Sequence, residues 1–213
     1  MHNLFAKGRF APINERFIKE SIIQLKGLAA IQAKYRKGDM DTLLNELHDS
    51  IVGKYLGFEL VNTEKHGFDC KLNKAQDIFL ESKTVSYLSN SWNATFNDTT
   101  MEKADAFRDK KVWLALSLWQ NASDLLCICF GQNKKIGDLL EDGVKKHQAG
   151  KTVRSTQSIS FSKLVFDLHF KILSPSLPAE ILMQRLHQQK HLKQLTAEFV
   201  IEYKDFVSIN SCF

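Results

Sequence analysis

The order in which helical and extended patterns alternate along the 213 residues constrains the fold more than any other feature. A helical pattern covers 11–38, and a second, which begins at an aspartate cap, covers 39–57. Three short strand patterns follow, and then a helix over 101–111 and two strongly apolar strands, "VWLALSLW" and "DLLCICFG". Helix, three-stranded meander, helix and further strands are typical of a single α/β domain in which helices flank a central mixed β-sheet.

The meander and the helix before it carry the clearest local patterns. Its strands are expected at 58–62, 68–72 and 77–86, with Gly67 and "NKAQ" in the turns between them. The apolar residues of the preceding helix recur at helical spacing and are expected to face the core. They are Leu43, Leu44, Leu47, Ile51 and Leu56. Further along, 135–148 predicts a helix, 157–173 a strand-rich segment and 178–203 a terminal helix.

The composition, 44% hydrophobic and 25% charged, is that of an ordered soluble protein. No apolar run approaches the roughly 18–20 residues of a membrane helix, and the first residues lack the apolar centre of a signal peptide. The four cysteines show no CxxC spacing, which disfavours a disulfide framework or a cysteine metal site. We therefore expect a cytoplasmic protein.

Charge is distributed unevenly along the chain. Residues 1–38 hold 8 Lys/Arg against 2 Asp/Glu, and 144–197 hold 9 against 2. Between them, 39–143 hold 11 against 17, and the last 16 residues hold 1 against 3. Basic segments on both sides of an acidic middle suit a protein that binds a polyanion and uses carboxylates on it. Lysine-rich solvated helix faces would give the same totals.

The hairpin "GFDCKLNKAQDIFLESKTVS" places charged residues in apolar strands. Residues two apart in a strand share a face, so Glu81 and Lys83 point together and Ser82 points away. If 74–76 form the turn, Asp69 lies directly opposite Glu81, whereas a four-residue turn would move Asp69 out of line. The hairpin therefore predicts a cluster of two carboxylates and a lysine.

Two converging carboxylates repel each other unless a cation lies between them, and hard oxygen ligands suit Mg²⁺. A neighbouring lysine can orient an attacking water or stabilise charge on a phosphate. Asp69–Lys71, with Glu59 as its upstream acid, is a competing placement of the same pattern. The trio can also be read as a cross-strand ion pair without chemistry. Asp109–Lys111 and Glu202–Lys204 repeat the spacing on predicted helices and are expected at the surface.

An acidic helix ending in Gly57-Phe58, a strand, "GFD", a strand, "ESK" and a basic-flanked helix together resemble the PD-(D/E)xK nuclease core. Type II restriction endonucleases and several DNA-repair nucleases share that core. The match runs from about Leu43 to Phe130, and Phe68 stands where the family has proline. The resemblance implies a restriction-endonuclease-like fold. Its catalytic core would span 39–131, between a basic N-terminal helix (1–38) and a basic C-terminal part (132–213).

The resemblance also implies roles for particular residues. Asp69 and Glu81 would hold Mg²⁺, and Lys83 would act in catalysis. Glu46 occupies the place of a helix glutamate that often joins the metal site in the family, with Asp49 as the alternative.

As a function, the resemblance implies a Mg²⁺-dependent, sequence-specific endonuclease of double-stranded DNA, most like a type II restriction enzyme. Such an enzyme acts as a homodimer on a palindromic site and is paired with a cognate DNA methyltransferase. No GxxxxGK[ST] loop occurs in the sequence, which argues against a motor-driven nuclease. A repair or junction-resolving nuclease with this core and a non-catalytic nucleic-acid-binding α/β domain are the alternatives.

Two polar segments are candidates for DNA contacts. "SYLSNSWNATFNDTT" offers short amides and hydroxyls, and "KKHQAGKTVRSTQS" offers basic and amide side chains. Either segment can also be an ordinary surface loop. The residues expected to bind DNA are Asn90, Ser91, Asn93, Thr95, Lys145, Lys146, Lys151, Arg154 and Gln157.

Overall fold

The computed structural model describes residues 15–34, 40–60, 68–73, 76–109 and 111–210. The chain divides into two compact units, 1–43 and 44–213. Helix α1 (Glu15–Lys34) belongs to the first unit, and helix α2 (Met40–Leu56) begins there. Within the described residues, no helix is long and apolar enough to cross a membrane.

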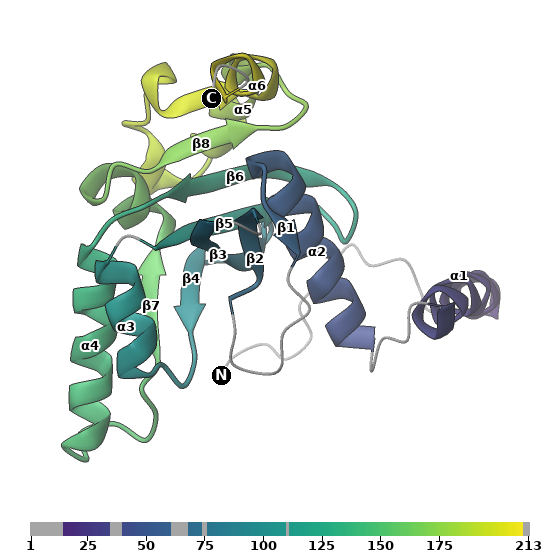
Figure 1. Cartoon of the computed structure of the whole chain (residues 1–213). Helices are drawn as coiled ribbons and strands as arrows, with labels where there is room; N and C mark the ends of the chain where they lie inside the picture. Colours follow the sequence, from purple (N-terminus) through teal and green to yellow (C-terminus); the bar gives the residue numbers. More distant parts are fainter. Residues whose placement is uncertain (1–14, 35–39, 61–67, 74–75, 110, 211–213) are drawn as a thin grey trace, which may run out of the picture. The chain divides into compact units, whose positions relative to one another are not determined.

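A mixed β-sheet runs through the second unit (Figure 1). Its strand order among the described residues is β1-β2-β3-β5-β6-β8-β9, with β3 parallel to β5, β8 parallel to β9 and the other neighbours antiparallel. The predicted α/β fold with a central mixed sheet is therefore confirmed. The strands are β1 (Glu59–Leu60), β2 (Cys70–Asn73), β3 (Gln76–Ser86), β5 (Val112–Trp119), β6 (Leu125–Gly131), β8 (Lys171–Ser174) and β9 (Val200–Glu202).

Two further strands, β4 (Asn93–Phe96) and β7 (Gln157–Ser160), pair with each other in an antiparallel ribbon outside the main sheet. The remaining helical elements connect the strands. They are α3 (Met101–Arg108), α4 (Lys135–Gln148), a π-helix (Lys163–Asp167), α5 (Ala179–Leu186), two 3₁₀-helices (Lys190–Leu192 and Ala197–Phe199) and α6 (Tyr203–Asn210).

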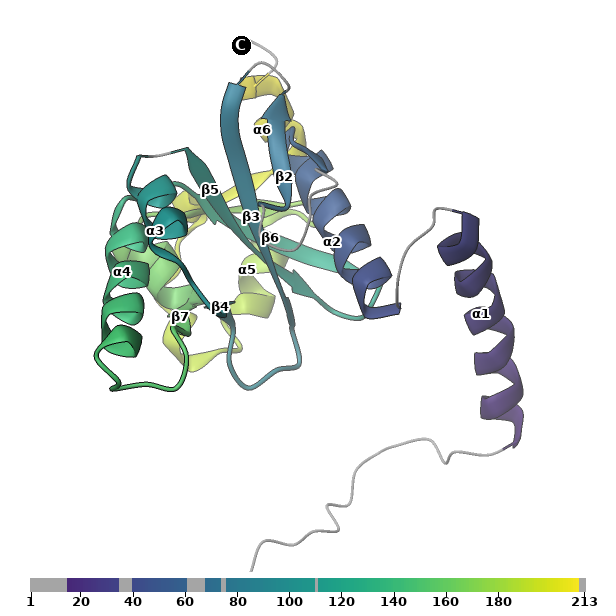
Figure 2. The ribbon, with the colours of Figure 1, turned by 60° about the horizontal axis from the view of Figure 1, so that its bottom comes forward.

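Helices cover both faces of the sheet because β5 is apolar on both sides. Leu114, Leu116 and Leu118 pack into a core that includes residues of α3 and α4. Ala115, which alternates with them, packs into a second core shared with Val52 of α2. Figure 2 shows α3 and α4 on one side of β3 and α2 on the other. Strand β3, which carries the predicted cluster, therefore lies between two sets of helices.

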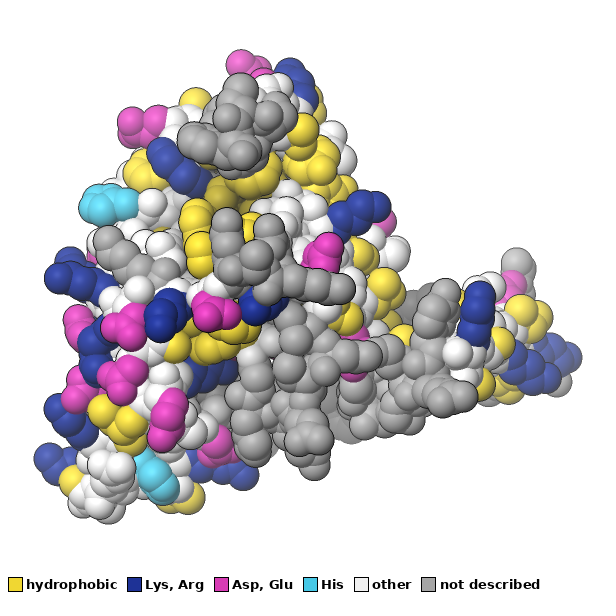
Figure 3. Space-filling view, viewed as in Figure 1, with side chains coloured by type: hydrophobic (Ala, Val, Ile, Leu, Met, Phe, Trp, Pro, Cys, Tyr) yellow, Lys and Arg dark blue, Asp and Glu magenta, His cyan; other side chains and the backbone are white. Residues whose placement is uncertain are grey.

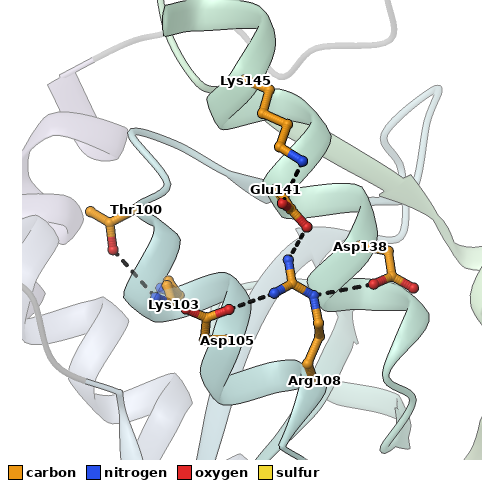
Figure 4. A network of polar contacts seen from close by, with 7 residues as sticks. All are labelled: Thr100, Lys103, Asp105, Arg108, Asp138, Glu141 and Lys145. Carbon is orange, nitrogen blue, oxygen red and sulfur yellow. Dashed lines mark hydrogen bonds and ion pairs between the residues drawn. The ribbon is translucent and has the colours of Figure 1, made fainter.

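Helices α3 and α4 are joined by a network of ion pairs (Figure 4). Arg108 of α3 binds Asp138 and Glu141 of α4 as well as Asp105 of its own helix. Glu141 also pairs with Lys145 at 2.6 Å. These contacts hold the two helices at a fixed separation along their polar sides.

A glycine allows the same two helices to approach closely. A Cβ atom at Gly137 would lie 2.4 Å from the carbonyl oxygen of Ala104, so only glycine fits at this crossing. The first turn of α3 is capped by Thr100, whose hydroxyl accepts the Lys103 N–H at 3.3 Å. Packing and capping together position Lys103 against the sheet.

The terminal helix predicted over 178–203 is wrong beyond Leu186. There α5 ends, and two 3₁₀-helices lead to β9. Leu186 and Leu192 are both fully buried, yet in a continuous helix they would point about 120° apart. Breaking the helix places both leucines in the core and lets β9 pair with β8.

The inward face predicted for α2 is also wrong at Leu47, which is 46% exposed. The buried side of this helix instead includes His48, Val52 and Leu56. Leu56 and the half-buried Asp49 lie seven residues apart, which is two helical turns, so Asp49 belongs to the side that faces the sheet.

Candidate active site

The β2–β3 hairpin brings Asp69 to Glu81. Cys70 pairs with Leu80 and Lys71 with Phe79, and continuing this register by one residue places Asp69 opposite Glu81, as predicted. The turn differs from the expected 74–76, because Asn73 pairs with Gln76 and a bulge between Lys71 and Asn73 restores the register.

The carboxylate of Asp69 accepts a backbone hydrogen bond from β3 that a neighbouring strand would otherwise accept. Its Oδ2 accepts the backbone N–H of Ser82 at 2.7 Å, at the point on β3 where the pairing with β2 has ended. This bond holds the carboxylate against β3, immediately beside the backbone of Glu81.

Glu81 is the most buried ionisable group of the cluster, with 2% of its surface exposed. Its Oε1 accepts hydrogen bonds from Lys83 Nζ and Lys103 Nζ, each at 2.6 Å. Burial alone would raise the pKa of Glu81, but the two ammonium groups outweigh it and hold the pKa below its usual value. Glu81 is therefore ionised at neutral pH. Its second oxygen, Oε2, is buried and has no hydrogen-bond partner among the described residues.

Helix α2 adds a third carboxylate, Asp49. The thiol of Cys70 donates to the Asp49 carbonyl at 3.5 Å, and a Cβ atom at Gly53 would lie only 2.9 Å from that sulfur. This close approach of α2 to β2 places Asp49 beside the start of β2, next to Asp69. Glu46, one turn earlier on the helix, is half-buried.

Burial and neighbouring carboxylates raise the pKa values of Asp69 and Asp49. Burial, followed by the charges of Glu81 and Asp49, raises the pKa of Asp69 to about 7. Burial is also the main cause that raises the pKa of Asp49 to about 6, with Glu81 and Glu46 adding to it and Ser82 and Lys83 opposing it. Of the two predicted helix acids, Asp49 thus interacts directly with the hairpin pair, and Glu46 acts on Asp49.

This coupling predicts how stability depends on pH in the metal-free protein. The folded pKa values of Asp49 and Asp69 lie above the ordinary 3.8, so the folded state binds more protons than the unfolded state between about pH 4 and 7. Their contribution to stability should therefore fall as pH rises through this window and level off above it. Asp69→Asn should remove the upper part of the decline. Urea unfolding of both proteins from pH 5 to 8 measures the difference, and parallel curves would contradict the coupling.

The donor atoms fit a divalent cation. Oxygen is the ligand type that Mg²⁺ prefers, and raised carboxylate pKa values together with an unpartnered buried carboxylate oxygen indicate acids crowded without sufficient counter-charge. Among the described residues, however, no three His, Cys, Asp or Glu side chains form a ready-made ligand cluster. Since Lys83 and Lys103 occupy one oxygen of Glu81, an ion would require that side chains shift within the site.

The competing placement would join Asp69 to Lys71 and Glu59, but these two residues lie outside the cluster. Lys71 Nζ pairs with Asp77 at 3.2 Å, near the hairpin turn. Glu59 pairs with Lys71 across β1 and β2 but is exposed. The structure therefore groups Asp69 with Glu81 and Lys83 rather than with Glu59 and Lys71. Asp109, Lys111 and Lys204 are exposed, as expected, whereas Glu202 is half-buried and accepts the backbone N–H of Ala179.

The basic candidates for DNA contacts fall into two groups. Lys145 and Lys146 lie on α4 and pair with Glu141 and Asp142 one turn earlier. Figure 3 shows basic and acidic side chains interspersed over α3 and α4. Lys151 and Arg154 follow α4 and are exposed, with the Nε of Arg154 4.0 Å from Asp98.

The polar candidates lie on the β4–β7 ribbon or in the chain just before it. Asn93 and Thr95 pair with Ser160 and Ser158, and their side chains lie on the face opposite the buried Ala94, Phe96 and Ile159. The hydroxyls of Thr95 and Ser158 are 3.0 Å apart. Gln157 opens β7 and packs against Gly143 of α4, while Asn90 and Ser91 lie in exposed chain before β4.

Lys103 is the site residue that sequence reasoning missed. Its position beside the buried residues Ala104 and Phe107 of an amphipathic helix was the available signal, because neighbours of a buried stripe can reach the sheet. The spacing in "ESK" indicates only Lys83, the lysine two residues after Glu81 in the sequence.

Comparison of the sequence with models of known protein families and with curated proteins finds no match. We therefore infer the function of the cluster from its own residues.

Proposed function

We propose that the chain is a Mg²⁺-dependent endonuclease that hydrolyses phosphodiester bonds of double-stranded DNA. The observation that carries this proposal is the convergence of Asp49, Asp69 and Glu81, from three separate elements, beside Lys83. Burying three acids so close together is costly unless a cation or a proton compensates them. Binding of a cation by the three carboxylates would explain why the fold tolerates that cost.

Asp69, Glu81 and Asp49 would hold the Mg²⁺ ion, with Glu46 behind Asp49. Bound Mg²⁺ would lower the pKa of an attacking water and stabilise negative charge on the phosphate. The protein's part is to hold its carboxylates in a fixed geometry. Asp69 is fixed by the Ser82 N–H, and Asp49 by the contact between α2 and Cys70.

Lys83 is suited to act on the phosphate or on the attacking water. It stays charged at neutral pH: burial alone would lower its pKa, but Glu81, Asp69 and Asp49 raise it above its usual value. Its Nζ lies 5.4 Å from the centre of the Phe96 ring, whose face favours a cation. A lysine held this way stabilises negative charge and cannot serve as a neutral base near pH 7.

The β4–β7 ribbon supports DNA as the polyanion. Residues 144–166, which include β7, contain five Lys/Arg and no Asp or Glu. A two-stranded ribbon is narrow enough for the major groove, and its outer face presents short amides and hydroxyls that can bond base edges. Lys151 and Arg154 would contact phosphates beside it, whereas Lys145 and Lys146 are less available because acids on their own helix bind them.

The resemblance to PD-(D/E)xK nucleases extends the proposal to a type II restriction enzyme, a cytoplasmic homodimer paired with a DNA methyltransferase. The order α2, β1, β2, β3, β4, α3 and β5, with β5 parallel to β3, is consistent with that resemblance. A repair or junction-resolving nuclease would use the same cluster.

One observation favours a non-catalytic alternative. The 2.6 Å contact between Lys83 and Glu81 is the ion pair expected of a purely structural cluster. Such a pair accounts for Glu81, but it gives no reason for placing Asp49 and Asp69 where burial and neighbouring carboxylates raise the pKa values of both. We therefore favour the nuclease.

Digestion of unmethylated phage DNA tests the proposal. Incubation with Mg²⁺ should yield discrete fragments, and EDTA should prevent their formation. Intact DNA after incubation with Mg²⁺ or Mn²⁺ over a range of pH would contradict nuclease activity. A smear in place of bands would show cleavage without sequence specificity, which supports a nuclease but contradicts a restriction enzyme.

A further inference from the structure

The side chains around Glu81 carry a surplus of positive charge. A single carboxylate oxygen accepts both Lys83 and Lys103, so this group of three side chains has one more positive than negative charge. Each Nζ lies 2.6 Å from the same oxygen, and the two ammonium groups are therefore at most about 5 Å apart, where they repel each other. An additional anion bound there would relieve the repulsion.

The opposite end of the cluster has the reverse imbalance. Asp69 accepts its hydrogen bond from the neutral backbone N–H of Ser82, and Asp49, a second acid, lies beside it. The site thus has an anionic end, suited to a metal ion, and a cationic end, suited to a phosphate oxygen. A phosphodiester group beside a divalent cation needs both.

Lys103 comes from a different element than the rest of the cluster. Its Nζ lies 5.6 Å from the centre of the Phe68 ring and 6.0 Å from that of Phe96, so aromatic faces support the ammonium without neutralising it. About a quarter of the side chain, 27%, remains exposed, which leaves it open to a ligand from solvent.

We propose that Lys103 is a second phosphate-binding lysine of the active site. In the absence of DNA, Glu81 holds the Lys103 ammonium in place. When DNA binds, one of its phosphate oxygens becomes the partner of this ammonium. Lys83 and Lys103 then approach the phosphate from β3 and α3. This inference rests on the proposed function, because it assigns the anion to DNA.

Binding of a fluorescein-labelled duplex in EDTA tests the assignment without cleavage. Each phosphate contact releases counterions, and losing one lowers the slope of log affinity against log salt by about 0.9. Lys103→Ala should show that loss, and it should reduce the cleavage rate in Mg²⁺ about 100-fold. Lys103→Arg keeps the charge and should keep the parent's slope.

Lys111→Ala is the matched control, since Lys111 is an exposed lysine just beyond the other end of α3. It should change the slope by less than half as much as Lys103→Ala. An unchanged slope in Lys103→Ala, with a lower unfolding midpoint, would show that Lys103 only anchors Glu81 and would overturn the inference while leaving the nuclease intact. A parent protein that neither binds nor cuts DNA would reject both.

Discussion

Replacing Lys83 by alanine is expected to abolish DNA cleavage while leaving binding of the metal ion intact. The substitution removes a positive charge next to the proposed position of the phosphate and removes none of the carboxylates. A group that acts mainly in the transition state changes kcat far more than it changes binding. We expect a loss of at least about 1,000-fold, equivalent to roughly 4 kcal/mol in the activation barrier.

Lys71→Ala is the natural control for this loss. Lys71 lies on the neighbouring strand and pairs with Asp77, outside the cluster. Its removal should leave cleavage within about tenfold, or roughly 1.4 kcal/mol. A time course of plasmid nicking compares both variants with the parent. If Lys71→Ala were inactive and Lys83→Ala active, the catalytic lysine would be Lys71, in the Asp69–Lys71 pattern. If both variants were active, neither lysine would take part in catalysis.

Glu81→Gln is expected to destabilise the fold as well as to prevent cleavage. The amide keeps the shape of the side chain but leaves Lys83 and Lys103 close together without the carboxylate that both of them bind. Removing one member of a fully buried pair costs about 3–5 kcal/mol. Because each lysine side chain is about one quarter exposed, we expect about 2 kcal/mol.

The pH dependence separates this charge effect from a loss of packing. The folded pKa of Glu81 is lowered, so its contribution is complete above its unfolded value of 4.5 and is lost as pH falls through the folded value. The difference between parent and Glu81→Gln should therefore shrink in acid. The double variant Glu81→Gln/Lys103→Met should recover part of the stability at neutral pH, because it removes one unpaired ammonium. Urea unfolding measures both effects, and a difference independent of pH would contradict the ion-pair account.

Sequence patterns predicted those parts of the site that depend on local spacing. Period-two alternation placed Glu81 and Lys83 on one face, and the hairpin register placed Asp69 opposite Glu81 despite an incorrect turn. Strands β3 and β5 were predictable as well, because each contains an apolar run of strand length.

Features that depend on packing between distant segments were not predictable in this way. Lys103 reaches Glu81 from α3, which packs closely against α4 at Gly137, and no spacing within "MEKADAF" specifies that contact. The preference for Asp49 over Glu46 follows from the approach of Gly53 to Cys70. The break after Leu186 follows from the burial of Leu192, which only the assembled core determines.

The central claim is that Asp49, Asp69 and Glu81 form a site for a divalent cation. Calorimetric titration of Mn²⁺ or Ca²⁺ into the metal-free protein tests it most directly. The parent should bind the ion and release protons near pH 7, because binding ionises Asp69, whose pKa lies at about 7. Asp69→Asn should show no binding. Equal heats for the parent and for Asp69→Asn would contradict the claim.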